Sequence, residues 1–413
     1  MAYSACLGGK LCGVCFPIEI EGFLDGLLSL NDLKTFRPMF KLSILPLSLL
    51  FLSNTYALEP LKDSTDKVVL ENVQRALDAF DTNGDGKIQK DEDAKRWERN
   101  ARYDEDKDGA FSREELAGIP VSYLDSPGKQ IRNVLFKRVG DLGVYLDIYL
   151  PDEDTSSEKP VILFTHGGGW AAGDRLKASN GSFAKVHQEL LKNGFCVVSV
   201  GYRLVKKGGD TAMRDCVIDC KDALRFVSAH RKELGIDPQK VYTFGDSAGG
   251  HLAQMVLFSP PSSLQGDAEL EKYSYKTVAG VSWYGPCDFQ DPQLFNHNDR
   301  ENFRDRFGPR IMGGKGKAED KEARYKEVSP VSYLSKDSAP LLMIQGDKDT
   351  TIPVKQAYRM QEALKTIKAP VEILIVKNAG HNWRSVDAPI TPTRNEIIKS
   401  TIDFLLKHSN EKK

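Results

Sequence analysis

The sequence predicts an α/β protein whose mostly parallel sheet is covered by helices on both faces, preceded by a small all-α module. Two observations lead to this fold class. From Ile131 onward, apolar segments typical of strands alternate with amphipathic segments typical of helices. Before that point, residues 58–120 are acidic, with 17 Asp and Glu against 11 Lys and Arg. The chain has 413 residues, so it can bury a full core beside a smaller module. Its formal net charge of −1 argues against nucleic acid or an anionic membrane surface as partner.

The first segment is typical of a secretory signal. Lys41 precedes an apolar run from Leu42 to Leu52, and small residues follow it. The run is too short to span a bilayer. We therefore expect residues 39–57 to be a signal peptide and the protein to be secreted or periplasmic. Because a signal begins a chain, we expect translation to start at Met39 and residues 1–38 to be a mis-assigned extension. The alternative is a short buried helix.

Two twelve-residue motifs in the acidic region are predicted to bind calcium. Oxygen ligands stand at loop positions 1, 3, 5, 7, 9 and 12, with glycine at position 6. In the first loop they are Asp81, Asn83, Asp85, the carbonyl of Lys87, Gln89 and Glu92; in the second they are Asp104, Asp106, Asp108, the carbonyl of Ala110, Ser112 and Glu115. Calcium takes six to eight hard oxygens, which this spacing supplies around a sharp turn. A solvated acidic loop is the alternative.

These loops resemble the EF-hand family, specifically its compact pairs in which one helix serves both loops, because only Asp93 to Tyr103 separates them. The resemblance implies a calcium-binding module over residues 58–120. In an exported protein we expect it to act as a structural staple or as a surface for a docking partner, rather than as a switch. Residues 121–130, with Pro127-Gly128, are predicted to be a linker.

The catalytic domain is predicted to cover residues 131–413. We expect an antiparallel hairpin first and then alternating strands and helices. The predicted strands are 133–139, 143–150, 161–165, 195–200, 241–245, 277–284, 341–345 and 371–376. The predicted helices are 177–192, 211–234, 251–259, 354–367 and 393–407, with a long polar insertion over 287–339.

Ser247 is the candidate nucleophile. A strand from Val241 runs into Gly245-Asp-Ser-Ala-Gly249, a G-x-S-x-G pattern, and a helix follows. On such a turn the serine is strained and exposed at the end of the sheet, and its flanking glycines avoid collisions with the strand and the helix. A glycine-rich turn with an incidental serine is the alternative.

A second glycine run, after the predicted strand 161–165, supplies the electrophilic half of an acyl-transfer site. His166-Gly-Gly-Gly-Trp170 allows backbone N–H groups to approach a developing oxyanion, and the N–H of Ala248 would complete the set. Phosphate binding is disfavoured because no Walker lysine follows the glycines. We expect His166 to brace the loop rather than to transfer protons.

Ser247 needs a base and an orienting acid. His381 lies in a loop closing the strand 371–376, whereas His408 belongs to the last helix. Asp347 and Asp349 lie in the loop that closes the strand 341–345. The chain order Ser, Asp, His differs from the order His, Asp, Ser of chymotrypsin-like proteases.

Residues 131 to about 408 resemble the α/β-hydrolase fold, specifically hormone-sensitive-lipase-like esterases and the feruloyl and acetyl xylan esterases. The resemblance rests on HGGGW, GYRL, GDSAGGHLA, WYGP, SP, GDKDTTIP and AGH. It implies a serine hydrolase without a catalytic cofactor, with Ser247, Asp349 and His381 as triad. In these relatives the acid lies three residues before an apolar-Pro pair, here Ile352-Pro353, which favours Asp349 over Asp347. The implied oxyanion donors are Gly168, Gly169 and Ala248.

The polar insertion over 287–339 and the hydrophilic calcium module favour a water-soluble or polysaccharide-borne ester over a lipid surface. We therefore expect a secreted carboxylesterase acting on acetyl or feruloyl groups. The alternatives are a peptidase or arylformamidase on the same fold, or a calcium-dependent binding or scaffold protein with an inactive hydrolase domain.

Four cysteines lie in the mature chain: Cys196, Cys216, Cys220 and Cys287. Export would permit disulfides, but Cys196 lies in an apolar strand and is expected to be a buried thiol. Cys216 and Cys220 are one helical turn apart, yet no second pair with zinc spacing exists, so we expect no metal there.

Overall fold

The computed structural model describes residues 80–152 and 158–410, together with Leu58 and a few residues between 69 and 78. The predicted extension 1–38 and signal peptide 39–57 lie outside the described residues. No helix in the described part of the chain is long and apolar enough to cross a membrane.

An eight-stranded sheet in the order β10-β9-β8-β7-β5-β6-β4-β3 forms the centre of the catalytic domain. Its strands are β3 Gln130–Val139, β4 Leu142–Tyr149, β5 Lys159–Thr165, β6 Cys196–Val200, β7 Ile236–Asp246, β8 Thr277–Trp283, β9 Leu341–Gly346 and β10 Val371–Val376. The β3–β4 and β4–β6 pairs are antiparallel, and all other pairs are parallel. The predicted fold class and the initial hairpin are therefore confirmed.

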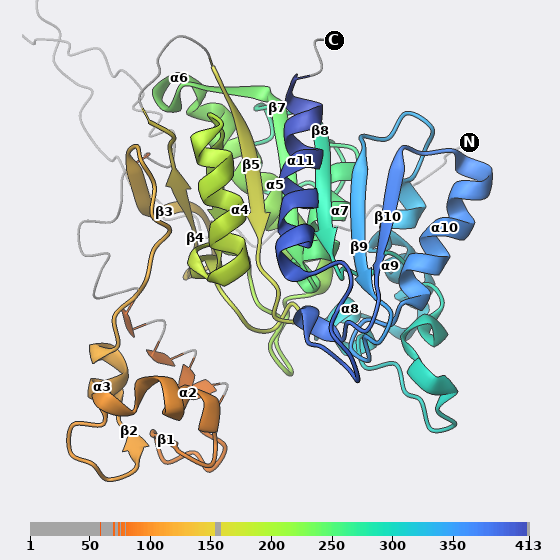
Figure 1. Ribbon diagram of the computed structural model, residues 1–413. Helices are drawn as coiled ribbons and strands as arrows, with labels where there is room; N and C mark the ends of the chain where they lie inside the picture. Colours follow the sequence, from red (N-terminus) through yellow and green to blue (C-terminus); the bar gives the residue numbers. More distant parts are fainter. Residues whose placement is uncertain are drawn as a thin grey trace, which may run out of the picture. The chain divides into compact units, whose positions relative to one another are not determined.

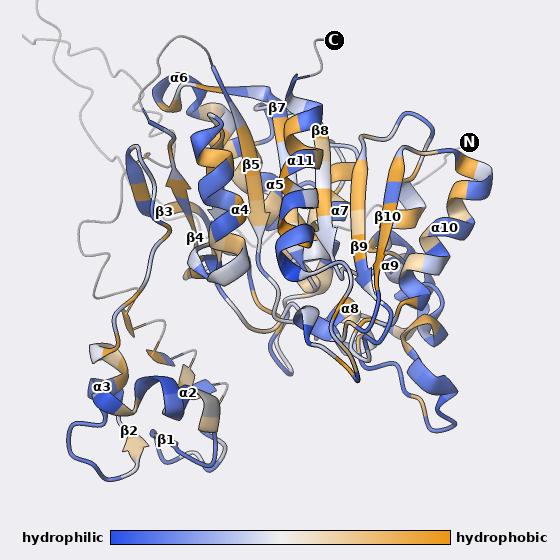
Figure 2. Ribbon diagram, viewed as in Figure 1, coloured by the Kyte–Doolittle hydropathy of each residue, from blue (hydrophilic) through white to orange (hydrophobic). Residues whose placement is uncertain are grey.

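Helices cover both faces of this sheet (Figure 1). They are α4 Gly181–Lys192, α5 Met213–Ala229, α6 Arg231–Leu234, α7 Ala248–Phe258, α8 Gly308–Met312, α9 Lys321–Glu327, α10 Lys355–Ile367 and α11 Arg394–Asn410. On one face, α4 and α11 pack together over a core that includes Phe164, Phe244 and Trp283. On the other, α5 and α7 pack over a core that includes Leu163 and Val198. Figure 2 shows the central strands as mainly apolar, as expected for a sheet buried on both faces.

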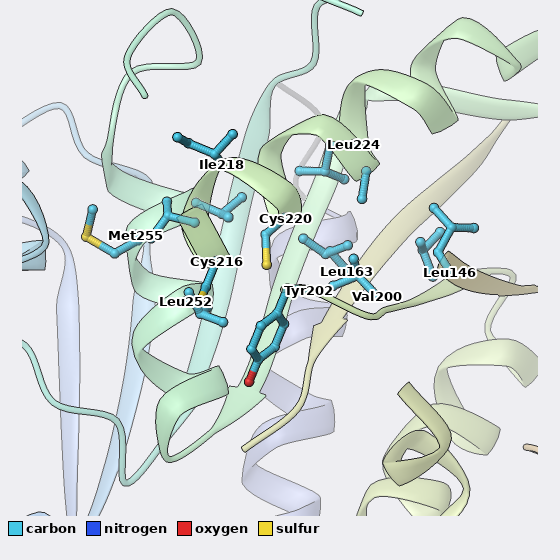
Figure 3. Packing of buried hydrophobic residues seen from close by; sticks show 14 of the residues in the cluster. Leu146, Leu163, Val200, Tyr202, Cys216, Ile218, Cys220, Leu224, Leu252 and Met255 are labelled. Carbon is cyan, nitrogen blue, oxygen red and sulfur yellow. The ribbon is translucent and has the colours of Figure 1, made fainter. Parts of the chain in front are cut away.

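The cysteines belong to these cores. Cys196, Cys216, Cys220 and Cys287 are all free and buried. Figure 3 shows Cys216 and Cys220 on α5 among Tyr202, Leu224 and Leu252. Burial raises the pKa of the Cys196 thiol to about 12. The burial expected for Cys196 is therefore confirmed, and all four cysteines of the described residues are free thiols packed in the cores.

Two predicted helices differ from the structure. The helix expected from Lys177 begins only at Gly181, because Arg175–Ser179 forms a short 3-10 helix, η2, and Asn180 is extended. The helix expected over 211–234 breaks at His230, where α5 ends and the short α6 begins. The pattern of apolar residues continues through both positions, so it does not predict where these helices begin or end.

The stretch predicted as a linker is partly packed on the catalytic domain. Leu124 is buried with Tyr149 and Val197. The Ser126 hydroxyl donates to the Leu150 carbonyl at 2.6 Å, and β3 already begins at Gln130. The packed part of the catalytic domain therefore begins near residue 124.

The insertion over 287–339 is more apolar inside than its composition indicates. It contains α8, α9 and the 3-10 helices η3 Pro292–Phe295, η4 His297–Asp299, η5 Ala318–Asp320 and η6 Pro330–Tyr333. Phe289, Phe295 and Phe307 are buried and in ring contact with one another, and Phe289 and Phe307 also pack on Trp170. The polar composition therefore describes the surface of the insertion, while these three aromatic rings lie inside it. Figure 1 shows α8 at the end of the sheet toward which β5 and β9 point.

The acidic module has a small core of its own. Its elements are β1 Ile88–Gln89, α2 Ala94–Asn100, the 3-10 helix η1 Ala101–Tyr103, β2 Ala110–Phe111 and α3 Arg113–Gly118. Strands β1 and β2 pair antiparallel, with Ile88 opposite Phe111. As predicted, one short helical segment, α2 with η1, serves both loops.

Candidate active site

Ser247 lies on the predicted sharp turn between β7 and α7. Its backbone has φ 53° and ψ −120°, a conformation that is strained for any residue with a side chain. Cβ atoms added to Gly245 and Gly249 would lie 2.3 Å from Thr165 Oγ1 and 1.9 Å from the Thr165 carbonyl oxygen. Both flanking positions therefore require glycine, for the reason predicted from the sequence.

Ser247, His381 and Asp349 meet although they are far apart in the chain. His381 Nε2 lies 3.1 Å from Ser247 Oγ, and His381 Nδ1 lies 2.7 Å from Asp349 Oδ2. His381 starts the 3-10 helix η7 His381–Trp383 after β10, and Asp349 follows β9. The three side chains follow β7, β9 and β10, parallel strands whose carboxyl ends lie at the same edge of the sheet.

Asp349 is held more rigidly than His381. Its Oδ1 accepts from the backbone N–H groups of Thr351 and Ile352 at 2.7 and 2.9 Å. The Asp349 side chain is 1% exposed, whereas that of His381 is 17% exposed. A buried carboxylate that orients one ring nitrogen leaves the other free to take a proton from the hydroxyl. Asp347 donates its own N–H to Val376 and has no described contact with His381.

The N–H groups of the predicted oxyanion donors are available. Gly168 and Gly169 follow β5 with φ 135° and 60°, and Ala248 is the first residue of α7. In the described part of the chain, none of these three N–H groups donates to another protein atom. A Cβ on Gly168 would lie 1.9 Å from the Ala172 carbonyl oxygen, so that turn requires glycine. Such donors can stabilise negative charge on an attacked carbonyl oxygen.

His166 braces the glycine loop, as expected. Its ring stacks on Tyr202 with centroids 4.2 Å apart, and Tyr202 donates to its carbonyl at 2.7 Å. Burial lowers the pKa of His166 to about 4, so the ring stays neutral near pH 7.

Asp246 connects the two halves of the site, a role that sequence reasoning missed. Its Oδ1 accepts the N–H of Gly167 at 2.8 Å, and its Oδ2 accepts Lys177 Nζ at 2.7 Å. The residue before the nucleophile therefore fixes the start of the glycine loop. The only sequence signal was its place inside the G-x-S-x-G pattern.

Two aromatic residues complete the surroundings, and neither was assigned a role from the sequence. Tyr284 follows β8, and its backbone has φ 40°. The centroid of its ring lies 4.7 Å from the centroid of the His381 ring. Trp170 Nε1 donates to His251 Nδ1 at 3.1 Å, and His251 Nε2 donates to the Val328 carbonyl at 2.7 Å. This chain of bonds anchors the glycine loop on α7 and on the insertion.

The first acidic loop gathers its predicted ligands. Asn83, Asp85 and Gln89 are linked by side-chain hydrogen bonds. Asp81 accepts the backbone N–H groups of loop residues 84 to 86, and Glu92 accepts those of residues 82, 83 and 89. Backbone N–H donors, led by that of Gln89, lower the pKa of Glu92 and keep it ionised.

The second loop has the same organisation. Carboxylate oxygens of Asp104, Asp106 and Asp108 lie within 4.8 Å of one another. Glu115 accepts from Glu105 N–H at 2.7 Å and forms a capping box with Ser112. Glycines at position 6 of the two loops have φ 84° and 85°. These oxygen donors fit a calcium ion, with the Lys87 and Ala110 carbonyls at loop position 7.

Comparison with known proteins places this geometry in a family. Residues 146–364 match the BD-FAE family model, and residues 73–92 match the EF hand model, which covers the first loop. The chain is similar to the probable carboxylic ester hydrolase LipM of Mycobacterium tuberculosis, with 30% identity over 55% of this chain and 50% of that protein. It is also similar to isoprenylcysteine alpha-carbonyl methylesterase ICME of Arabidopsis thaliana, with 25% identity over 64% and 60%. The chain thus spans about half to three fifths of these relatives.

Solved structures share the fold. Butyrate-bound esterase 2 of Thermogutta terrifontis aligns with a TM-score of 0.53 and 24% identity over 66% of this chain and 92% of that chain. A truncated carbohydrate esterase from gut microbiota aligns with a TM-score of 0.56 and 24% identity over 71% and 100%. At this identity the likeness shows an α/β-hydrolase fold. Since the BD-FAE match covers more than half of the sequence, the chain belongs to the BD-FAE esterase family.

Proposed function

We propose that the protein is a secreted serine carboxylesterase that hydrolyses acetyl or feruloyl esters on carbohydrates or small soluble molecules. The observation that carries this proposal is the line of contacts from Asp349 through His381 to Ser247, with N–H groups that have no protein acceptor in the adjoining glycine loop and at the start of α7. Membership of the BD-FAE family and similarity to carboxylic ester hydrolases support the reaction class. Export is proposed from the signal-like segment 39–57.

The reaction follows from the geometry. Ser247 Oγ attacks the ester carbonyl carbon while His381 Nε2 takes its proton, and the oxyanion is stabilised by the N–H groups of Gly168, Gly169 and Ala248. The carbon–oxygen bond to the alcohol breaks as His381 returns the proton to the leaving oxygen. Water then attacks the acyl-enzyme with the same assistance, releasing the acid and restoring the Ser247 hydroxyl.

A soluble ester fits the rim of this site better than a lipid. Among the described residues, the large apolar side chains that are exposed are Leu70, Val139, Leu142 and Tyr358, and none lies in the 287–339 insertion. A hollow of about 460 Å³ at His381 is lined by two cationic side chains, Lys348 and Arg384, by Thr350, Thr351 and Asn382, and by Gly380 and Val386. Lipid-binding sites need contiguous apolar surface, so these observations favour a polar substrate.

The acidic loops are proposed to hold structural calcium. No step of the chemistry above needs a metal, because the serine is activated by histidine. Bound calcium would stabilise the module and could present it to a docking partner.

A substrate panel tests the proposal. Acetylated xylan and methyl ferulate represent the proposed esters, aminoacyl anilides represent a peptidase, and N-formylkynurenine represents an arylformamidase. The proposal expects kcat/KM for the first two to exceed that for the others by at least about tenfold, a difference of about 1.4 kcal/mol in transition-state stabilisation. Preferential cleavage of the anilides or of the formamide would replace it with one of these rivals.

A further inference from the structure

Two half-buried arginines of the insertion, Arg306 and Arg310, lie against the two loops that build the active site. A Cβ added to Gly169 would lie 2.8 Å from Arg310 Nη1, so this guanidinium touches the glycine loop. Arg306 donates to the carbonyl of Thr351, two residues after the acid Asp349. The two cations therefore lie beside the oxyanion loop and the acid loop.

The aromatic cluster of the insertion holds the two guanidinium groups in place. Their Cζ atoms lie 4.7 Å (Arg306) and 5.6 Å (Arg310) from the Phe307 ring centroid. Phe307 is buried and packs edge-on against Trp170, which directly follows Gly169. Because the Phe307 ring is fixed by packing, its contacts with the two guanidinium groups restrict where these groups can lie.

Neither arginine has a carboxylate partner among the described residues. Arg306 Nε is buried and forms no hydrogen bond. Burial lowers the pKa of Arg310 with no anion opposing the shift. Burial also lowers the pKa of Arg306, and neighbouring Arg300 adds to the effect; Asp349 opposes it, but that carboxylate is bound to His381 and forms no ion pair with Arg306.

Several other buried or half-buried arginines in the described part of the chain pair with carboxylates, whereas Arg132 and Arg324 bond only to an amide and to a backbone carbonyl. Arg175 pairs with Asp147, Arg203 with Asp219, Arg214 with Glu327 and Arg225 with Asp222. An unpaired guanidinium out of water is costly, so the fold normally compensates it.

Nearby carboxylates are already used. Asp305 accepts from the Tyr325 hydroxyl and from the N–H groups of Phe307 and Gly308. Asp299 pairs with Lys355. The missing counter-ion is therefore not supplied by these neighbours.

We propose that Arg306 and Arg310 form an anion-binding subsite that selects esters bearing a carboxylate, either on the acyl group or on the alcohol, as in an acetylated uronic acid. This inference rests on the proposed esterase function and names its substrate class. Guanidinium groups bind carboxylates through two parallel hydrogen bonds. In a partly desolvated site such bonds are stronger than at an open surface.

Matched pairs of substrates test the subsite. On the acyl side, monomethyl succinate is compared with methyl butyrate; on the alcohol side, monoacetylated methyl glucuronide is compared with monoacetylated methyl glucoside. We expect kcat/KM in one arm to favour the anionic ester by about tenfold or more, chiefly through KM. Raising the ionic strength should reduce this preference. Equal kcat/KM within both pairs would overturn the proposal.

Variants assign the preference to these residues. Arg310→Gln and Arg306→Gln should each lower the ratio of anionic to neutral kcat/KM by about tenfold, and Arg310→Lys should retain part of it. Arg231→Gln is the matched control, because Arg231 is exposed on α6, before the amino end of β7. An unchanged ratio in both glutamine variants would contradict the assignment.

Direct binding separates this inference from the proposed function. Calorimetry with Ser247→Ala and all four esters measures affinity without turnover. If no ester is hydrolysed by the wild type but the glucuronide binds about tenfold more tightly than the glucoside, the esterase proposal fails and the subsite stands. If esters are hydrolysed and neither anionic member of the two pairs binds better, the subsite fails and the esterase proposal stands.

Discussion

The catalytic centre and the two loops proposed to bind calcium are both polar sites, but they are assembled in opposite ways. The Ser247 and His381 side chains meet across 134 positions of sequence, because the parallel strands β7 and β10 end at the same edge of one sheet, with β8 and β9 between them. Each calcium loop draws its ligands from twelve consecutive residues, whose carboxylates accept N–H groups of the same loop. The first depends on the whole fold, and the second is local. Changes to the centre should therefore alter rate, and changes to the loops should alter stability.

The largest effect is expected from Ser247→Ala. Without the nucleophile, kcat on 4-nitrophenyl acetate should fall on the order of a million-fold, as for a triad serine. The residual rate would come from the remaining oxyanion donors. Steady-state kinetics on folded protein checks this, and near-normal turnover would remove Ser247 from the mechanism.

Asp349→Asn should have the next largest effect, because the amide no longer fixes the tautomer of His381. In a triad this change costs about 10⁴ in kcat. Asp347→Asn is the matched control in the same loop, and it should leave kcat within a few-fold. A reversal of the two results would mean that Asp347 serves as the acid.

A smaller effect is expected from Asp246→Ala. The change removes the acceptor for Gly167 N–H and for Lys177, so the glycine loop loses its anchor without losing a donor. Since removing one oxyanion donor costs about 10² to 10³ in kcat, misplacing the loop should cost about 10 to 100. Steady-state kinetics and thermal melting check this. A variant with unchanged kcat and an unchanged melting temperature would contradict the prediction.

Calcium removal should have the smallest effect on rate. Ions at a hundred times their dissociation constant add about 2.7 kcal/mol to the state that binds them. Chelation should lower the melting temperature of the acidic module and leave kcat on a small ester within a few-fold. Loss of turnover on chelation with the fold intact, restored by calcium, would show that the loops take part in the active site.

Much of the catalytic centre could be predicted because its residues stand in short motifs with steric causes. Gly245 and Gly249 are required by contacts with Thr165, and the order of loops after β9 and β10 follows from a parallel sheet. Most predicted strands match within a few residues for the same reason, since buried strands are continuous apolar runs.

The supporting residues could not be predicted, because their partners are far away in sequence. Asp246 acts through the glycine loop, and nothing in its own segment indicates that. The composition of the insertion is polar, yet its scattered aromatic residues meet on Trp170 and position two arginines. The break at His230 has no glycine or proline at the position itself. Such features depend on three-dimensional packing rather than on local pattern.

The most direct test of the central claim is covalent labelling of the purified full chain with a fluorophosphonate, followed by mass spectrometry of its peptides. The probe reacts with a serine only when a base and an oxyanion site activate it. The account predicts one adduct per chain, on Ser247, and none in Ser247→Ala. A folded wild-type chain that remains unlabelled would contradict it and favour a calcium-dependent binding protein with an inactive hydrolase domain.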